Sequence, residues 1–189
     1  MQDPSVFDGN NLDNEKFVVQ FVWTAASWTE STNALYNDCG VWLQKLLPSS
    51  DNWNTNSGFK FGGGNVFYGS YSTDYQAAGT FEYLWAAFRV PASDVAGRTE
   101  FKTFNVAPVT GTSVGIRLIR TSATGFKSEL YADADFDSTP TVATLTDTAM
   151  IGDIQDIRYL LIAGYKEVGA SGTNEATLDS LKIWNGINL

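Results

Sequence analysis

Short apolar runs alternate with polar segments along the whole chain, and this pattern predicts β-strands. Residues 17–23 read FVVQFVW, an almost unbroken apolar run that is typical of a strand buried on both faces. Residues 81–90 read FEYLWAAFRV and predict a long strand, which Pro91 ends because proline cannot donate to a ladder. Residues 99–106 alternate between apolar and polar positions, as a strand with one solvent-facing side does.

Two hairpins are predicted between these runs. Residues 114–120 and 126–132 are joined by a five-residue polar turn with a glycine at its end. The triple glycine Gly62–Gly64 predicts a second hairpin between residues 58–61 and 66–71. The remaining candidate strands are residues 40–47, for which a short helical turn is the alternative, 156–165 and 176–184.

About ten strands with turns every eight to twelve residues, and no amphipathic helix, predict an all-β protein. Without crossover helices the strands cannot form a parallel sheet. Such strands form a sandwich or a barrel, and the turn spacing and length favour an antiparallel β-sandwich of about ten to twelve strands. The 189 residues form a single domain (1–189), because no linker or internal repeat divides them. Residues 1–12 are expected to be an irregular or vector-derived arm.

Charge and composition exclude several classes of function. The chain carries 12 Lys and Arg against 21 Asp and Glu, a net charge of −9, which disfavours binding to nucleic acid or to anionic membranes. No apolar run approaches the roughly 20 residues of a membrane span. Histidine is absent, so imidazole-based hydrolysis and His-ligated zinc are excluded, and one cysteine, Cys39, allows no intrachain disulfide.

The end of the chain resembles the closing strands of concanavalin A-like jelly rolls, in particular their laminin-G-like branch. The pattern is an Asp, two alternating apolar residues, an aromatic residue and an Asn. It falls here on Asp179, Leu181, Ile183, Trp184 and Asn185. The early segment SVFDGNN followed by FVVQFVW is similar to the opening of the same branch. This resemblance covers about a third of the chain; it implies a jelly-roll fold and allows calcium in the loops.

The segment from Ser49 to Gln76 combines aromatic residues with amides and carboxylates. Sugars offer apolar C–H faces to aromatic rings and hydroxyl groups to amides and carboxylates, so this composition favours a glycan site. The candidate ligand-binding residues are Trp53, Asp51, Asn54, Tyr71 and Tyr75. The alternative is structural, because alternate aromatic residues in a strand also form a core and Asn favours turns.

Asp133, Asp135 and Asp137 form a D-x-D-x-D pattern. Carboxylates at alternate positions can converge on calcium where the chain turns, since calcium prefers oxygen ligands. The complete helix-loop-helix calcium motif is missing, because Ser138 follows where it has a glycine. Calcium is therefore the one candidate cofactor, and a solvated acidic strand end is the alternative.

Catalysis has less support. Arg98, Glu100 and Lys102 share one face of a predicted strand, which resembles the arginine-x-glutamate strand of alginate-lyase-type jelly rolls. Those enzymes also use a histidine, and this chain has none. A glycosidase pair of carboxylates would have to come from distant positions such as Glu82 and Glu129.

Three functions remain. The first is a noncatalytic carbohydrate-binding domain, secreted or displayed on the cell surface, whose partner is a polysaccharide or glycan. The second is a self-associating structural subunit of a virion or extracellular assembly. The third is a polysaccharide-active enzyme, a lyase or glycosidase.

Overall fold

The structure is a computed structural model in which the described residues form antiparallel β-strands. The backbone is described for residues 11–29, 37–44, 66–76, 79–89, 99–103, 109–146, 148, 155, 157, 159–166 and 173–186. Within the strands, side chains are described for residues 17–27, 41, 43, 113–122, 125–131, 141–145, 160 and 175–185. Within these ranges no helix is long and apolar enough to cross a lipid bilayer.

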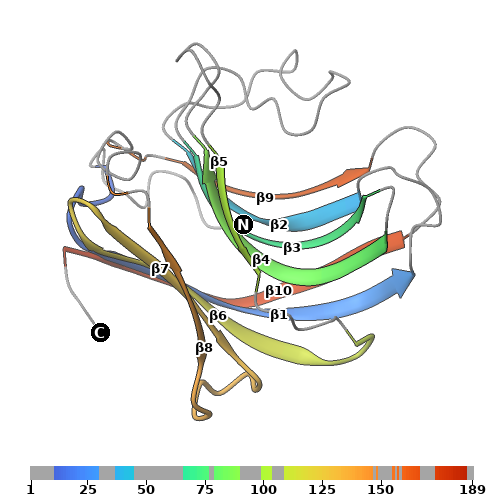
Figure 1. Ribbon diagram of the computed structural model, residues 1–189. Coiled ribbons are helices and arrows are strands. Elements are labelled where there is room, and N and C mark those ends of the chain that lie inside the picture. The colour runs from blue at the N-terminus through green and yellow to red at the C-terminus, as the bar shows by residue number, and fades with distance from the viewer. Residues whose placement is uncertain are drawn as a thin grey trace.

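The strands form two five-stranded sheets (Figure 1). The first sheet has the order β10 (Thr173–Asn185), β1 (Phe17–Thr29), β6 (Ser113–Ser122), β7 (Gly125–Tyr131), β8 (Thr141–Leu145). The second has the order β5 (Thr99–Thr103), β4 (Gly79–Arg89), β3 (Val66–Gln76), β2 (Asn37–Gln44), β9 (Tyr159–Lys166). Every described strand pair is antiparallel, so the expectation of antiparallel β-structure is confirmed for the part of the chain that the structure describes.

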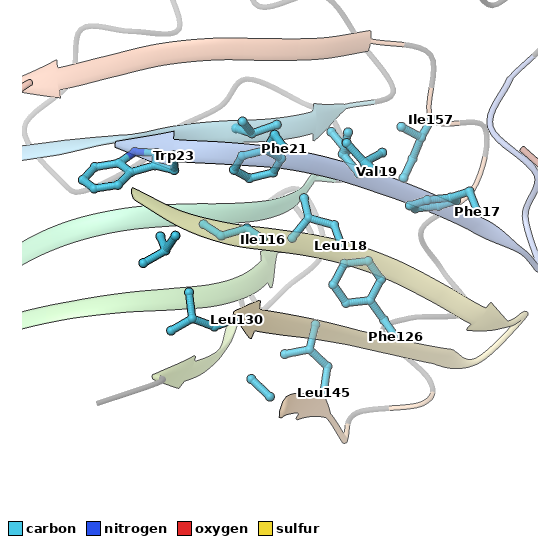
Figure 2. Packing of buried hydrophobic residues seen from close by; sticks show 14 of the residues in the cluster. Phe17, Val19, Phe21, Trp23, Ile116, Leu118, Phe126, Leu130, Leu145 and Ile157 are labelled. Carbon is cyan, nitrogen blue, oxygen red and sulfur yellow. The ribbon is translucent and has the colours of Figure 1, made fainter. Parts of the chain in front are cut away.

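The described core contains side chains from both sheets. Alternate residues of β1, from Phe17 to Trp23, point into it beside Leu118 of β6 and Phe126 of β7 (Figure 2). From the second sheet, Val41 and Leu43 belong to the same cluster and are fully buried. Burying one such side chain stabilises the fold by about 1.5–3 kcal/mol.

Strand β1 is buried on both faces, as the FVVQFVW run predicts. Residues 17–23 are each at most 7% exposed, including Gln20 at 6%. Val18 and Val22 lie on the face opposite the core cluster and are buried as well. The outer face of the first sheet is therefore not an ordinary solvent-exposed surface.

The predicted hairpin between residues 114–120 and 126–132 is confirmed, because β6 pairs with β7 across Thr121–Gly125. Arg120 lies at this end of the core, 1% exposed, and donates to the carbonyl oxygens of Ser122 and Ala123. Burial lowers the pKa of Arg120 to about 10, although the negative charges of Asp13 and Glu15 act to raise it.

Strand β8 was missing from the sequence prediction. It reads TVATL, and only Ala143 and Leu145 are buried, so its apolar signal is too short to stand out. Strand β3 pairs with β2 along one edge and with β4 along the other, so residues 66–71 have no free edge for the hairpin predicted across the triple glycine. The hairpin partner proposed for β3, residues 58–61, lies outside the described residues.

Candidate functional site

A polar cluster occupies the outer face of the first sheet, opposite the core. Gln20, Arg117 and Glu129 are neighbours in one row across β1, β6 and β7. Arg117 Nε donates to Gln20 Oε1 at 2.8 Å, and its Nη1 donates to Tyr131 Oη at 2.7 Å. Tyr131 Oη in turn donates to Glu129 Oε2 at 2.8 Å, and Lys127 Nζ lies 2.6 Å from Glu129 Oε1. We call these five residues the Arg117 cluster.

The cluster keeps Glu129 ionised. Burial alone would raise the pKa of Glu129, but hydrogen bonds from Lys127 and Tyr131 and the charges of Lys127 and Arg117 outweigh it, so the pKa lies below its usual value. For Tyr131, burial and the hydrogen bond to Glu129 raise the pKa. Each oxygen of the Glu129 carboxylate accepts a hydrogen bond, Oε1 from Lys127 and Oε2 from Tyr131.

The loop after β7 covers part of this cluster. The guanidinium carbon of Arg117 lies 4.8 Å from the ring centroid of Tyr131 and 5.0 Å from that of Phe136, within cation–π range. Phe136 has a φ of 66°, an unusual conformation for a bulky residue. A Cβ at Gly115 would lie 2.7 Å from Phe136 Cε1 and 2.9 Å from Asp133 O, so only glycine fits beneath the loop.

Asp133 organises that loop. Its Oδ1 accepts the backbone N–H groups of Asp135 and Asp137, and its Oδ2 accepts that of Ser138. The Ser138 hydroxyl and these N–H groups lower the pKa of Asp133 to about 2. The carboxylate thus replaces the hydrogen bonds that the turn cannot make with its own backbone.

Calcium at Asp133, Asp135 and Asp137 stays a prediction. Asp135 and Asp137 are exposed, and no group of three acidic or cysteine side chains is placed to hold a metal ion within the described residues. A calcium site here would require Asp135 and Asp137 to turn toward a carboxylate that already holds the loop.

The second sheet has a different outer face, which its backbone register defines. Successive residues of a strand alternate between faces, and directly paired residues share a face. Val41 and Leu43 of β2 lie in the core, so Gly40 and Trp42 take positions on the outer face. The registers of β2 with β3, β3 with β4, and β4 with β5 run without a break, and these assignments therefore extend across the sheet.

Aromatic residues occupy many of these outer positions. One row across the sheet carries Trp42, Tyr68 and Phe101, with Ala87 between the last two. The next row carries Trp85. Its partners in the neighbouring strands are Gly40, Ser70, Ala163 and Thr103.

Hydroxyl and carboxylate residues follow in the adjoining rows. Asp38, Ser72 and Tyr83 share one row, and Asp74 shares the next with Phe81. Strands β9, β2, β3 and β4 appear in Figure 1 as arcs that bend the same way. Positions for large aromatic residues therefore lie beside positions for small and polar ones on this face of the sheet.

Three of the predicted ligand residues, Asp51, Trp53 and Asn54, lie outside the described residues. Tyr71 is paired with Cys39 and Leu84, and Tyr75 with Thr80. The register puts both tyrosine positions on the face of Val41 and Leu43, the face that forms the core. These five residues remain predictions.

The candidate catalytic residues are not brought together. Glu129 belongs to the first sheet, whereas Glu82 and Glu100 belong to β4 and β5 of the second, on the face of Val41 and Leu43. Lys102 shares that face, and Arg98 lies outside the described residues. A general acid needs a raised carboxyl pKa, and that of Glu129 is lowered.

Sequence reasoning missed the outer-face residues Trp42, Tyr68 and Trp85 as candidates. The signal was present in β4, where Phe81, Tyr83 and Trp85 recur at every second position. It is ambiguous in the sequence, because Leu84, Ala86 and Phe88 on the other face of the strand are apolar as well. Only the burial of Val41 and Leu43, carried across the sheet by the register, tells the two faces apart.

Comparison with known proteins gives distant structural similarity only. The sequence matches no protein-family model and no curated protein. One similar solved structure is a functionally unknown protein from Saccharomyces cerevisiae, with 10% identity and a TM-score of 0.44 over 92% of this chain and 71% of that one. Another is the polysaccharide lyase family 18 protein aly-SJ02 r-CATD, with 10% identity and a TM-score of 0.46 over 95% of this chain and 76% of that one. Neither similarity assigns a function at this level.

Proposed function

We propose that the protein is a noncatalytic carbohydrate-binding domain with a jelly-roll β-sandwich fold, and that it binds a polysaccharide on the outer face of its second sheet. The observation that carries this proposal is the row of Trp42, Tyr68 and Phe101 with Trp85 beside it, on the face opposite Val41 and Leu43. Aromatic residues that gather on one outer sheet face, with polar residues in the adjoining rows, are typical of an interaction site.

The composition of this face suits a sugar chain. The aromatic positions offer rings to C–H faces, and the neighbouring Asp38, Ser70 and Ser72 supply donors and acceptors for hydroxyl groups. Neighbouring strands lie about 4.8 Å apart, so a row of positions that crosses four strands spans roughly 15 Å. That is long enough for several consecutive sugar units.

Binding without cleavage is supported by the environment of Glu129 and by the composition. Glycoside hydrolysis needs two carboxyl groups on either side of the bond, one of them protonated. Glu129 is held ionised by Lys127 and Tyr131, and the chain contains no histidine to serve as a base. We place the protein outside the cell or at its surface, where polysaccharides are found, with the loop that carries Trp53 as a second point of contact.

A self-associating subunit of a virion or extracellular assembly is the second candidate, because the same aromatic face would also pair with a copy of itself. The two candidate functions predict different behaviour of the purified protein. A binding domain remains monomeric and is retained by a polysaccharide, whereas an assembly subunit forms oligomers that the loss of Trp42 or Trp85 dissociates.

The test is affinity electrophoresis of the native chain through gels that contain a panel of neutral and acidic polysaccharides, with size-exclusion chromatography in parallel. We expect retardation by at least one polysaccharide, a monomer, and no release of reducing ends. Trp42→Ala is expected to weaken retardation about tenfold or more, which corresponds to about 1.4 kcal/mol. Retardation by none of the panel, together with an oligomer that Trp42→Ala dissociates, would support assembly instead. Reducing ends or unsaturated products would overturn the noncatalytic assignment.

A further inference from the structure

The end of β10 is tied to the N-terminal segment by hydrogen bonds. The backbone N–H of Asp13 donates to Asn185 Oδ1 at 2.6 Å, and Asn185 Nδ2 donates to the carbonyl oxygen of Asn11 at 3.1 Å. The backbone N–H of Gly186 donates to the carbonyl oxygen of Lys16 at 2.8 Å. We call these five residues the Asn185 clasp. Because Asn185 uses both ends of its amide, the clasp depends on an asparagine at this position.

Asn185 is chemically vulnerable because glycine follows it. Asn185–Gly186 is the one Asn-Gly pair in the sequence. Asparagine is a thermolabile residue, and a following glycine has no side chain to hinder attack by its own backbone nitrogen. Gly186 adopts a φ of 74°, and a Cβ there would meet nothing closer than Asp13 Oδ2 at 4.0 Å. Asn185 itself is exposed to solvent.

We infer that Asn185 is a deamidation site whose reaction is gated by the Asn185 clasp. The backbone nitrogen of Gly186 loses its proton to water or base and attacks Cγ of Asn185. A bond forms between that nitrogen and Cγ, Nδ2 takes up a proton from water or the protonated base, the Cγ–Nδ2 bond breaks, and Nδ2 leaves as ammonia. Water then opens the five-membered succinimide at either carbonyl and leaves aspartate or isoaspartate. No oxidant or reductant takes part.

The closed clasp blocks this reaction at both reacting groups. The Gly186 N–H is held by the Lys16 carbonyl, and the Asn185 amide is fixed between Asp13 and Asn11. Attack therefore requires the clasp to open first, so the rate in the native protein reports the fraction of open molecules.

Once the reaction has occurred, the clasp cannot close as before. A carboxylate has no N–H to donate to the Asn11 carbonyl, and it adds a negative charge at the position that accepts the N–H of the acidic residue Asp13. Isoaspartate also adds an atom to the main chain, which moves the Gly186 N–H out of register with Lys16. The turn of residues 11–16 is then released, and with it Leu12, which is 2% exposed and donates its N–H to the carbonyl oxygen of Ile157.

The experiment follows deamidation of Asn185 by peptide mass spectrometry at pH 8 and 37 °C, in the native protein and in denaturant. We expect the native rate to be at least tenfold lower. Asp13→Ala removes the carboxylate that holds the N–H groups of Glu15 and Lys16, so it should raise the native rate several-fold. Asp179→Ala, an exposed acidic residue on the same strand, is the matched control and should leave the rate unchanged. Circular dichroism confirms that both variants are folded.

A second readout is trypsin cleavage after Lys16. Asn185→Asp should be cleaved there several-fold faster than the native chain, and native protein that has been aged should become equally susceptible. Equal deamidation rates in native and denatured protein, no effect of Asp13→Ala, or full protection of Lys16 in Asn185→Asp would each overturn the inference.

Discussion

The outer faces of the two sheets carry different residue types. On the first sheet, Arg117 and Lys127 are satisfied within the protein by Glu129, Tyr131 and Gln20. On the second sheet, the register lines up aromatic positions with small and hydroxyl-bearing ones. The first face is closed by its own charges and by the loop that carries Phe136, which explains why Gln20 and Glu129 are buried. The polar groups of the Arg117 cluster are therefore engaged within the protein.

Removing the shared core should have the largest effect, because it destabilises both faces together. Phe21→Ala removes a ring that is 1% exposed and leaves a cavity, so we expect a loss of about 3–5 kcal/mol in the free energy of unfolding. Urea denaturation followed by tryptophan fluorescence measures it. Val142→Ala, at a position that is 50% exposed, should change stability by less than about 0.5 kcal/mol. A small effect of Phe21→Ala would mean that the two sheets do not share this core.

The next prediction separates structure from binding on the first sheet. Glu129→Gln keeps the shape of the side chain but removes the carboxylate that pairs with Lys127 and accepts the Tyr131 hydroxyl. We expect the free energy of unfolding to fall by about 1–3 kcal/mol. Polysaccharide retardation at a temperature where the variant is folded should be unchanged. Loss of retardation without loss of stability would move the binding site to the first sheet.

The sequence predicted the strands better than it predicted their faces. The apolar run of β1 and the β6–β7 hairpin followed directly from pattern and turn chemistry. The Arg117 cluster did not, because Arg117, Lys127 and Glu129 look like an ordinary solvent face until the register places them beside Gln20. The role of Gly115 was equally invisible, since it depends on a loop about twenty residues further along the chain.

Acid should loosen the loop on the first sheet. The pKa of Asp133 is lowered to about 2 in the folded protein. Its contribution to folding stability is therefore fully present above pH 3.8, the ordinary pKa, and is lost as the pH falls from there toward 2. The lowered pKa of Glu129 adds a loss of the same sign below its usual value of 4.5. Asp133→Asn should flatten the fall in melting temperature between pH 4 and pH 2, as measured by differential scanning fluorimetry. A profile identical to that of the native chain would show that the Asp133 hydrogen bonds do not stabilise the loop.

A further stability prediction concerns calcium at Asp133, Asp135 and Asp137. If the loop binds the ion, stability rises by mass action, by about 2.7 kcal/mol at a hundredfold excess over the dissociation constant and by less at lower excess. Melting temperatures in chelator and in millimolar calcium measure it, with the double variant Asp135→Asn and Asp137→Asn as control. Equal melting temperatures in the two conditions would show that the loop does not bind calcium.

The proposed function depends most directly on which sheet face binds a polysaccharide. Each outer face carries a tryptophan that can be removed, Trp85 on the second sheet and the half-buried Trp184 on the first. Titration of each Trp→Ala variant with the polysaccharide that retards the native chain, followed by the fluorescence of the remaining tryptophans, compares them directly. We predict that Trp85→Ala weakens binding at least tenfold and that Trp184→Ala leaves the dissociation constant within about twofold. Equal affinities for both variants and the native chain, or a loss confined to Trp184→Ala, would contradict the assignment of the second sheet as the binding face.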